Sequence, residues 1–495
     1  MSLNPSAVQP NVWRVEPRDH ALQDSRSGFQ YRWVLLWVIG LSVLGFGSLM
    51  TLVTAALPTI ATDLNTTTAN AGWVLTGLML AMAVGTPAGG KLGDIYGHRN
   101  TFIWGLVGMT VTMIMNYWVW NIGTFIAVRV LFGVSGALLM PSGMALLMHA
   151  FGIEERAKAV GWFQFAMTGA PTIGVVAGGP LLDILGWRSV FAIFGVIGLI
   201  ATVLAIVVVK PIPKGERSAI DWLGAIFLAS ATLLILLAIT RIPKVTSSGA
   251  SVLTDLPVWL MFLSSLPLYV LFVIWEKRVA SPLLDIRLFS KPTFALPLGS
   301  AACNQFAYMG AFVVIPSVLQ GPYGYSVGAA ALLMVPRPGV FAIASPLGGS
   351  LVTKTGMRFP MVIGSTAMIC SMIAFAFGSE PANFGLAFII VGLVLSGVSA
   401  GIGSPAYQTM VANSVEDADL GIANGMNQTV MWMGMILGIQ SMLAFAGTDL
   451  SLGRLRATFI FAAVIAALGY SAPLFAARSR KEDLAQVSEL DNEPV

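Results

Sequence analysis

Long uninterrupted apolar runs dominate the pattern of hydrophobic and polar positions along the chain, as in 33–47 and 190–209. The strands of a membrane β-barrel would alternate polar and apolar residues instead. A helix needs about 20 apolar residues to cross the hydrocarbon core of a bilayer. At that length the pattern predicts about fourteen membrane-spanning helices. They lie at 33–60, 71–93, 101–120, 123–150, 158–182, 189–209, 221–241, 257–276, 294–318, 327–352, 359–378, 384–411, 421–446 and 456–477.

The composition supports this interpretation. Of the 495 residues, 56% are hydrophobic and only 10% are charged, whereas a soluble domain carries about 25% charged residues. Lipid cannot hydrogen-bond to backbone groups, so a chain this apolar must cross the membrane as helices. The sequence therefore predicts an all-α integral membrane protein. We expect no nucleic-acid partner, because the basic residues lie in loops that flank the spans.

Catalysis and metal binding find little support among the side chains. The histidines His20, His98 and His149 are too scattered for a metal cluster, and Cys303 and Cys370 fall inside apolar runs as small buried hydrophobes. The sequence shows no nucleophile–base arrangement, no phosphate-binding Gly-Lys-Ser loop and no large soluble domain. We therefore expect no cofactor, no metal and no enzyme. An integral membrane enzyme is the alternative from another class.

Lysine and arginine predict the orientation of the chain. With the N-terminus inside, twenty basic residues of the loops and tails fall on the cytoplasmic side and five on the outer side. The positive-inside rule demands this bias, and a shift by one helix would destroy it. We expect a multi-pass protein of the plasma membrane with both termini in the cytoplasm.

Two segments repeat at nearly the same offset. Residues 86–99 align with 345–358 at an offset of 259, and 133–141 align with 397–405 at an offset of 264. Parallel repeats of six helices place a binding cavity between two bundles, and it can open to either side by rocking. The predicted parts are a tail at 1–31, a six-helix bundle at 32–209, a linker with two additional helices at 210–293, a second six-helix bundle at 294–477 and a tail at 478–495.

The loop after the second predicted helix carries a compact motif, Gly90-Lys-Leu-Gly-Asp94-Ile-Tyr-Gly97-His-Arg99. It resembles the loop signature of the major facilitator superfamily. Gly90 and Gly97 permit a tight turn, and Asp94 can accept bonds from helix amides or pair with a basic residue of the facing bundle. Gly90, Asp94, Gly97 and Arg99 are therefore predicted to latch the cytoplasmic side closed. A solvated polar turn is the alternative.

A charged side chain, Arg129, lies inside the fourth predicted helix. An unpaired arginine is costly in lipid and should face the bundle interior or water. Snorkelling to the outer surface is the alternative. Its position resembles the arginine motif of the superfamily, and this resemblance implies a role in proton coupling, which Asp94 could share.

The fifth predicted helix carries Pro171, Gly174, Gly178 and Gly179. Small residues let two helices pack closely and pivot, and the series resembles the glycine-rich motif of the exporting branches of the superfamily. The match is partial, because Val175 stands where that family usually has proline. A generic helix-packing surface would look much the same.

The segments 282–289, 324–326 and 425–438 resemble the fourteen-span drug:proton antiporters of this superfamily. One departure is that the resemblance implies an aspartate on the first helix, where this chain has Leu49. No carboxylate lies near the middle of any predicted span. Coupling therefore runs through Asp94 and Arg129, runs through a titrating substrate, or does not exist.

Neutral polar and aromatic groups inside apolar helices are the candidates for a substrate cavity. They are Trp73, Asn304, Gln305, Tyr308, Asn427, Gln428 and Trp432. For each of them, interhelical hydrogen bonding or packing is the alternative. A cavity without a carboxylate favours neutral or weakly charged amphiphiles over dications, because desolvating a cation without a counter-charge is unfavourable.

The sequence as a whole is interpreted as a secondary active transporter, expected to be a monomer. It would export small amphiphilic compounds such as drugs, secondary metabolites or lipid-like molecules by alternating access, as a proton antiporter. The replacement of the first-helix aspartate by Leu49 motivates an alternative, an uncoupled facilitator or an importer of a specific metabolite.

Overall fold

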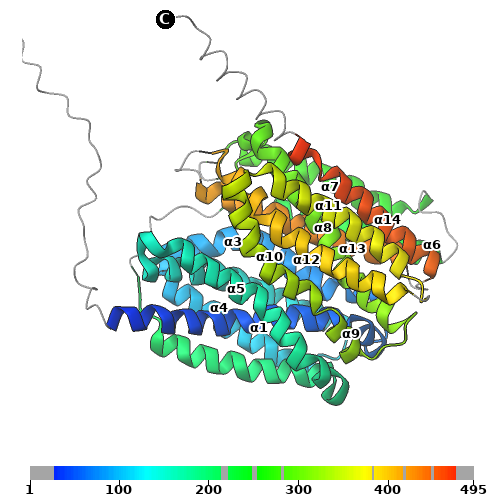
Figure 1. Ribbon diagram of the computed structural model, residues 1–495, viewed down its shortest axis with the longest axis horizontal. Helices are drawn as coiled ribbons and strands as arrows, with labels where there is room; N and C mark the ends of the chain where they lie inside the picture. The colour runs from blue at the N-terminus through cyan, green and yellow to red at the C-terminus, as the bar shows by residue number, and fades with distance from the viewer. Residues whose placement is uncertain are drawn as a thin grey trace, which may run out of the picture.

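The structure is a computed structural model that describes residues 27–212, 221–247, 254–279, 282, 284–381, 384–415, 420–447 and 451–474. Within 152–180 it describes the backbone but not the side chains. The regular elements of this part of the chain are all helices, and they run roughly alongside one another (Figure 1). The predicted all-α membrane fold is therefore confirmed.

The first group of helices, here called the N-terminal bundle, runs from α1 to α5. Its elements are α1 (Ser27–Asp63), α2 (Thr68–Ala71), α3 (Trp73–Tyr96), α4 (His98–Met115), the short 3-10 helix η1 (Asn116–Trp118) and α5 (Ile122–Val208). The bounds of α5 cover three predicted spans, but its ribbon doubles back (Figure 1). Gly186 inside α5 has a φ of 74°, which residues with a side chain rarely adopt. This glycine therefore marks a break between the fifth and sixth predicted spans.

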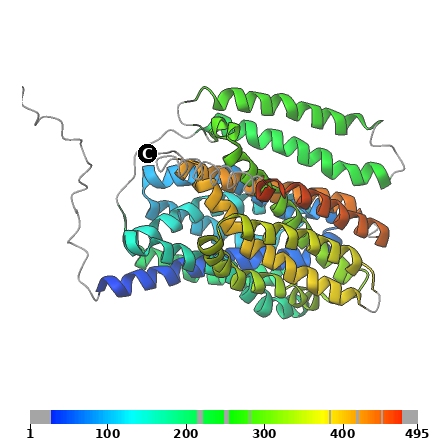
Figure 2. The same cartoon turned by 45° about the horizontal axis from the view of Figure 1, so that its top comes forward.

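Two helices that follow the N-terminal bundle in the sequence and precede the C-terminal one are here called the accessory pair. They are α6 (Trp222–Ser247) and α7 (Leu256–Glu276). They pack against each other, and α6 also contacts α3 and α13. Figure 2 shows the pair as two green helices along one outer face of the molecule. Large apolar side chains of α7, among them Trp259, Leu263 and Leu266, are exposed. Such an apolar face suits contact with lipid.

The remaining helices form the C-terminal bundle. Its elements are η3 (Ile286–Ser290), α8 (Pro292–Gln320), α9 (Val327–Leu333), α10 (Pro336–Thr355), α11 (Arg358–Gly378), α12 (Gly385–Ala412), α13 (Leu420–Ala446) and α14 (Leu452–Leu468). The tenth predicted helix is thus two helices, α9 and α10. Pro336 has no backbone N–H to continue the ladder, so the helix restarts with this proline in its first turn.

Twelve helical segments of the described residues are long and apolar enough to cross a membrane. The third predicted span corresponds to α4, which does not belong to the twelve because its first turn, His98-Arg99-Asn100, is polar. The fifth predicted span, 158–182, lies almost wholly where side chains are not described. The number fourteen therefore stays a prediction.

The sequence repeat has a local counterpart in the backbone. Gly97 and Gly356, 356 − 97 = 259 residues apart, have φ values of 98° and 77°. Each ends a helix by donating its N–H to the carbonyl four residues earlier, on Gly93 and Val352, at 2.8 and 3.0 Å. The two loops that the sequence aligned therefore turn in the same way.

The repeat also appears in how the helices approach each other. Three glycines of the N-terminal bundle and three of the C-terminal bundle lie where an added Cβ would meet the backbone of the partner helix. The pairs are Gly89 with Ala137 and Gly348 with Gly401; Gly133 with Leu78 and Gly397 with Arg337; and Gly105 with Ser135 and Gly364 with Ser399. Corresponding members are 259 or 264 residues apart, so the two bundles share the same close helix crossings.

Candidate functional site

Most of the described hydrogen bonds between the two bundles lie at one end of the molecule, and one more, from the Thr429 hydroxyl to the Ala83 carbonyl at 3.4 Å, lies near the middle of α3. That end is here called the outer end. The opposite end, where α3 meets α4 at Gly97, is called the inner end. Gln440 on α13 donates to the Thr76 hydroxyl of α3 at 2.8 Å and accepts from the Thr240 hydroxyl of α6 at 3.1 Å. The Thr240 oxygen also accepts from Trp73 Nε1 at 3.0 Å. One buried network therefore joins both bundles and the accessory pair.

Two further contacts close the outer end. Gln320, at the end of α8, donates to the Ala55 carbonyl of α1 at 2.7 Å. Asp183 of α5 accepts from the Ser326 hydroxyl and from the Gly328 N–H, both at 2.8 Å. The two bonds to Asp183 come from the N-terminal turn of α9, whose free N–H groups suit a carboxylate. In this structure the bundles are therefore held together at the outer end.

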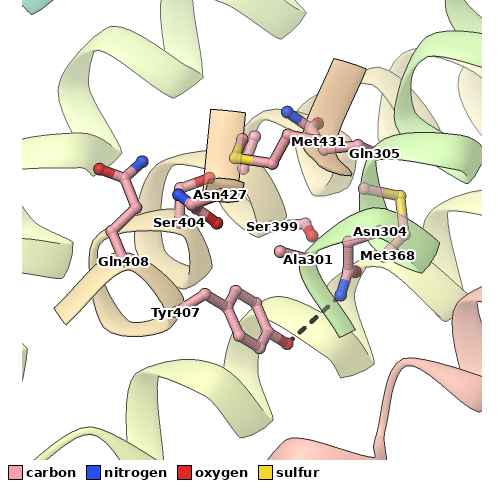
Figure 3. A pocket seen from close by; sticks show the side chains of 11 residues that line it. Ala301, Asn304, Gln305, Met368, Ser399, Ser404, Tyr407, Gln408, Asn427 and Met431 are labelled. Atoms are coloured by element: carbon pink, nitrogen blue, oxygen red, sulfur yellow. Dashed lines mark hydrogen bonds between the residues drawn. The ribbon is translucent and has the colours of Figure 1, made fainter. Parts of the chain in front are cut away.

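A cavity lies between mid-depth and the inner end, inside the C-terminal bundle (Figure 3). Side chains from α8, α11, α12 and α13 surround it. They are Ala301, Asn304, Gln305, Met368, Ser399, Ala400, Ser404, Tyr407, Gln408, Asn427 and Met431. Its volume of about 20 Å³ is enough for about one water molecule. The cavity is therefore about the size of one water molecule and is lined by neutral polar groups, and its lining comes from the C-terminal bundle alone, not from both bundles as the repeat predicted.

Amide groups give this cavity its chemistry. Asn304 donates to the Tyr407 hydroxyl at 3.3 Å, and Tyr407 shares a 2.6 Å hydrogen bond with the Ser365 hydroxyl. The oxygens Asn304 Oδ1 and Asn427 Oδ1 are buried without a hydrogen-bond partner among the described residues. A buried acceptor without a partner is costly. The cavity can therefore accept hydrogen bonds from a cargo or from water.

The structure brings together only some of the predicted cavity residues. Asn304, Gln305 and Asn427 line the cavity, whereas Gln428 is exposed. Trp432 packs at the edge of the main core. Trp73 belongs to the outer network and Tyr308 to an arginine site described below. Sequence reasoning missed Tyr407 and Gln408, although a polar pair inside the apolar helix α12 was the signal that could have found them.

Arg129 is completely buried in the N-terminal bundle. Its Nε donates to the Val74 carbonyl at 3.4 Å, and its Nη2 lies 3.8 Å from Met50 Sδ. The guanidinium lies 4.8 Å from the ring centre of Phe132 and 5.8 Å from that of Phe191. Such aromatic faces attract a cation. The bundle interior, and not the surface, therefore holds this arginine, and the snorkelling alternative is wrong.

Leu49, at the position where the resemblance implies an aspartate, is buried and lines a wholly apolar cavity beside Arg129. Phe191 belongs to this cavity and to the arginine site. Arg129 Nη1 has no hydrogen-bond partner in the described part of the chain. Arg129 is therefore surrounded by two rings, a thioether and one carbonyl, and no ion pair to it appears among the described residues.

A second buried arginine, Arg337, was missed by sequence reasoning although it lies inside the tenth predicted span. It is 2% exposed. Its Nη2 donates to the Tyr308 carbonyl at 2.6 Å, and its guanidinium lies 3.5 Å from the Tyr308 ring centre and 4.3 Å from that of Phe312. The signal was an arginine between two prolines in an apolar run, because such a side chain is as costly in lipid as Arg129.

The predicted loop is shorter in the structure, because α3 continues to Tyr96 and only Gly97 separates it from α4. The hydrogen bonds and ion pair described for Asp94 and Arg99 stay within the N-terminal bundle. Asp94 Oδ1 lies 3.1 Å from His98 Nε2, one turn further along. Arg99 donates to the carbonyls of Val209 and Ile206 at 2.6 and 2.9 Å, which caps the end of α5. Gly97 supplies the positive φ that its place in the motif predicted. A bond from Asp94 to the facing bundle is not seen among the described residues.

The glycine-rich motif of the fifth predicted helix, Pro171, Gly174, Gly178 and Gly179, lies within α5. The side-chain surroundings of these residues are outside the described part of the structure. Their role in packing and pivoting therefore stays a prediction.

Comparison with known proteins identifies the family. A family model described as Major Facilitator Superfamily matches residues 37–438 and, in a second match, 298–491. The chain is 31% identical over 399 residues to the drug efflux pump JefA of Mycobacterium tuberculosis, covering 80% of this chain and 76% of that one. It is 27% identical over 418 residues to the tetracenomycin C resistance and export protein of Streptomyces glaucescens, covering 83% and 76%.

Solved structures agree on the fold. A crystal structure of a POT family transporter in complex with 5-aminolevulinic acid superposes with a TM-score of 0.68 at 12% identity, covering 91% of this chain and 96% of that one. The chain belongs to the major facilitator superfamily, and the names of its relatives support the predicted multidrug efflux branch. It is a multi-pass membrane transporter of small molecules and not an enzyme.

Proposed function

We propose that this transporter exports small amphiphilic compounds by alternating access between two bundles, 32–209 and 294–477. The observation that carries the proposal is a small amide-lined cavity toward the inner end of a molecule whose two bundles are hydrogen-bonded to each other at the outer end. Neutral amide groups line the cavity together with Met368 and Met431, and methionine adapts to ligands of varied shape. A polar group of the cargo would bond to the amides and its apolar part would contact the thioethers.

Export direction and orientation are part of the same proposal. Relatives whose names describe drug efflux and antibiotic export support an outward direction. The basic residues support a plasma-membrane protein with both termini in the cytoplasm. In that orientation the cavity lies toward the cytoplasm, where an exporter takes up its cargo.

We propose further that export is driven by protons entering in exchange. Drug export against a gradient needs an energy source. The sequence shows no phosphate-binding Gly-Lys-Ser loop of the kind that binds ATP, so we take the proton gradient as that source. Arg129 and the loop residue Asp94 remain the coupling candidates from the family resemblance, with Gly90, Gly97 and Arg99 shaping the loop that would latch the inner end.

An efflux assay tests the proposal. Cells that overexpress the transporter should accumulate less of a fluorescent amphiphile than control cells, and collapse of the proton gradient should restore accumulation. In proteoliposomes, addition of the amphiphile should cause proton movement in the opposite direction. Efflux that persists unchanged after collapse would leave export standing and reject proton antiport.

A second candidate function is uncoupled or inward transport of one specific metabolite. It is favoured by Leu49, since the position that would carry the first-helix acid is buried in an apolar cavity instead. Equal rates of cargo movement in both directions, insensitive to a pH gradient, would support this candidate over antiport.

A further inference from the structure

The inner end of the accessory pair is a close contact between α6 and α7. Asp221, the residue before α6, accepts from Trp275 Nε1 of α7 at 2.8 Å. A Cβ added to Gly224 would lie 2.5 Å from Glu276 Oε1 and closer still to Asp221 Oδ2. The start of α6 and the end of α7 therefore approach each other closely, with two buried carboxylates beside a glycine.

Two further contacts tie α6 to α7 along their length. Near mid-depth the hydroxyls of Thr232 and Tyr269 share a hydrogen bond of 3.0 Å. At the outer end Arg241 donates to the two carboxylate oxygens of Asp255 at 2.9 and 3.2 Å. The pair is bonded at both ends and in the middle, so we treat α6 and α7 as one unit.

A shared apolar cluster joins this unit to the C-terminal bundle. Leu228 of α6 and Phe272 of α7 pack in one cluster with buried side chains of α8, α12 and α13. The described members of this cluster include no residue of the N-terminal bundle. The Thr232 hydroxyl also lies 3.7 Å from Met433 Sδ on α13. Because side-chain packing of this kind is what holds helices together in a membrane, the unit is attached to the C-terminal bundle.

The accessory pair meets the N-terminal bundle through α2 and α3. At the outer end Trp73 Nε1 donates to the Thr240 hydroxyl at 3.0 Å. Leu236, one turn earlier on α6, joins the main core that both bundles share. At the inner end Lys91 of α3 lies within electrostatic range of both carboxylates of the pair. The two polar interactions therefore lie at the two ends of α3, where rocking of one bundle against the other displaces a helix most.

Rigid-body rocking keeps the contacts inside each body and breaks those between bodies. We propose that the accessory pair moves with the C-terminal bundle as one body, and that Thr240 and Gln440 of this body together hold the start of α3 when the outer end is closed. Thr240 accepts from Trp73, and Gln440 donates to Thr76, three residues further along α3. When the outer end opens, α3 leaves both residues, whereas the bond from Thr240 to Gln440 persists.

The chemistry of Trp73 gives the accessory pair a part in this closure. An indole N–H can only donate, and that of the buried Trp73 has the Thr240 oxygen as its acceptor. The Thr240 proton points to the Leu236 carbonyl at 2.7 Å and to Gln440 Oε1 at 3.1 Å. The accessory pair therefore supplies an acceptor that the closed outer end uses. This inference rests on the proposed alternating access.

Reversible cross-linking tests which bundle carries the pair. Two double-cysteine variants are compared, each with one cysteine on α6 and the two α6 positions two turns apart. Trp73→Cys with Thr240→Cys links α6 to the N-terminal bundle, and Thr232→Cys with Met433→Cys links it to the C-terminal bundle. A short reducible reagent that joins two thiols should stop export of a fluorescent amphiphile in the first variant and leave it unchanged in the second.

Each variant serves as its own control. Both are made in a chain whose native cysteines, Cys303 and Cys370, are replaced by alanine. Export is measured before the reagent, after it, and again after reduction, so that recovery assigns the loss to the link and not to the substitutions. Export stopped by the link between α6 and α13, or unchanged by the link between α3 and α6, would overturn the inference.

Distances between spin labels leave the residues of the outer closure intact. Labels at Ile226 of α6 and Phe445 of α13, both exposed, should keep one distance with and without the amphiphile and across pH. Labels at Ile226 and at Tyr96, the exposed last residue of α3, should change their distance. A change between Ile226 and Phe445 would overturn the inference while alternating access stands. If both distances stay constant, the bundles do not rock, and the proposed alternating access is rejected together with this inference.

Discussion

Among the described residues each bundle buries one arginine, but on opposite members of an equivalent helix pair. At the repeat offsets, Arg129 corresponds to Leu393 and Arg337 to Leu78, and both leucines are completely buried. The first helices align through Pro58 and Pro316, at an offset of 316 − 58 = 258. That alignment matches Met50, which contacts Arg129, with Tyr308, which binds Arg337. Each arginine therefore reaches the same position of its bundle's first helix from a different neighbour.

This difference distinguishes positions that helix packing fixes in both bundles from positions that it leaves free. The glycine crossings recur in both bundles, because close backbone contact leaves no choice of side chain. The arginines do not recur at the same positions, although a buried guanidinium is costly in either bundle. A costly group at non-equivalent positions shows that the two bundles, although related by the repeat, are not interchangeable.

The largest expected effect concerns the shared crossings. In Gly89→Val and Gly348→Val the new side chain would meet the backbone of α5 or α12, and a clash of this kind costs about 1–3 kcal/mol or more. The adjacent controls are Gly90→Val, which has only an ordinary contact, and Gly349→Val, which has open space. The yield of folded transporter after detergent extraction should fall in the first two variants only. Equal yields for all four would break the comparison.

The next effect concerns the arginines. Arg129→Leu and Arg337→Leu give each bundle the residue that the other bundle has there. Replacing a buried charge by an apolar residue of similar volume leaves stability unchanged or raises it, by about 1–4 kcal/mol in known cases. Transport should nevertheless fall about tenfold, which corresponds to about 1.4 kcal/mol. Thermal unfolding and efflux rates measure the two effects separately. Wild-type transport by both variants would reduce the arginines to packing.

A smaller effect should distinguish the amide group that lines the cavity from the neighbouring amide outside it. Asn427→Ala removes a cavity acceptor and should raise the half-saturating concentration of a hydrogen-bonding amphiphile about fivefold, since one hydrogen bond contributes about 1 kcal/mol. Gln428→Ala changes the neighbouring amide, whose side chain is exposed. Saturation curves of both variants in proteoliposomes give the comparison. A larger shift in Gln428→Ala would place the cargo elsewhere.

The smallest effect concerns the two equivalent loops. Gly97→Ala and Gly356→Ala place a Cβ at φ values of 98° and 77°, which costs about 1–2 kcal/mol for a residue with a side chain. Both variants should melt a few degrees lower than the wild type, by similar amounts. If the melting temperature falls only in Gly97→Ala, the two loops do not impose the same backbone conformation, and their equivalence is rejected.

The sequence by itself determined the membrane class, the family and most helix positions, because apolar run length and glycine spacing are local properties. It also predicted that Asn304, Gln305 and Asn427 belong to one cavity. It could not place Tyr308 and Gln428, since their helices offer several faces and only packing decides which one is buried.

Only the tertiary structure decided which distant groups meet. Asp221 and Glu276 are 55 residues apart and end different helices, and Lys91 comes from another bundle. Nothing in local hydrophobicity records that these two buried carboxylates lie within electrostatic range of one lysine. Local pattern governs whether a segment enters lipid, whereas the meeting of Asp221 and Glu276 beside Gly224 depends on how α6 and α7 pack, and that is why the fold was predictable and this meeting was not.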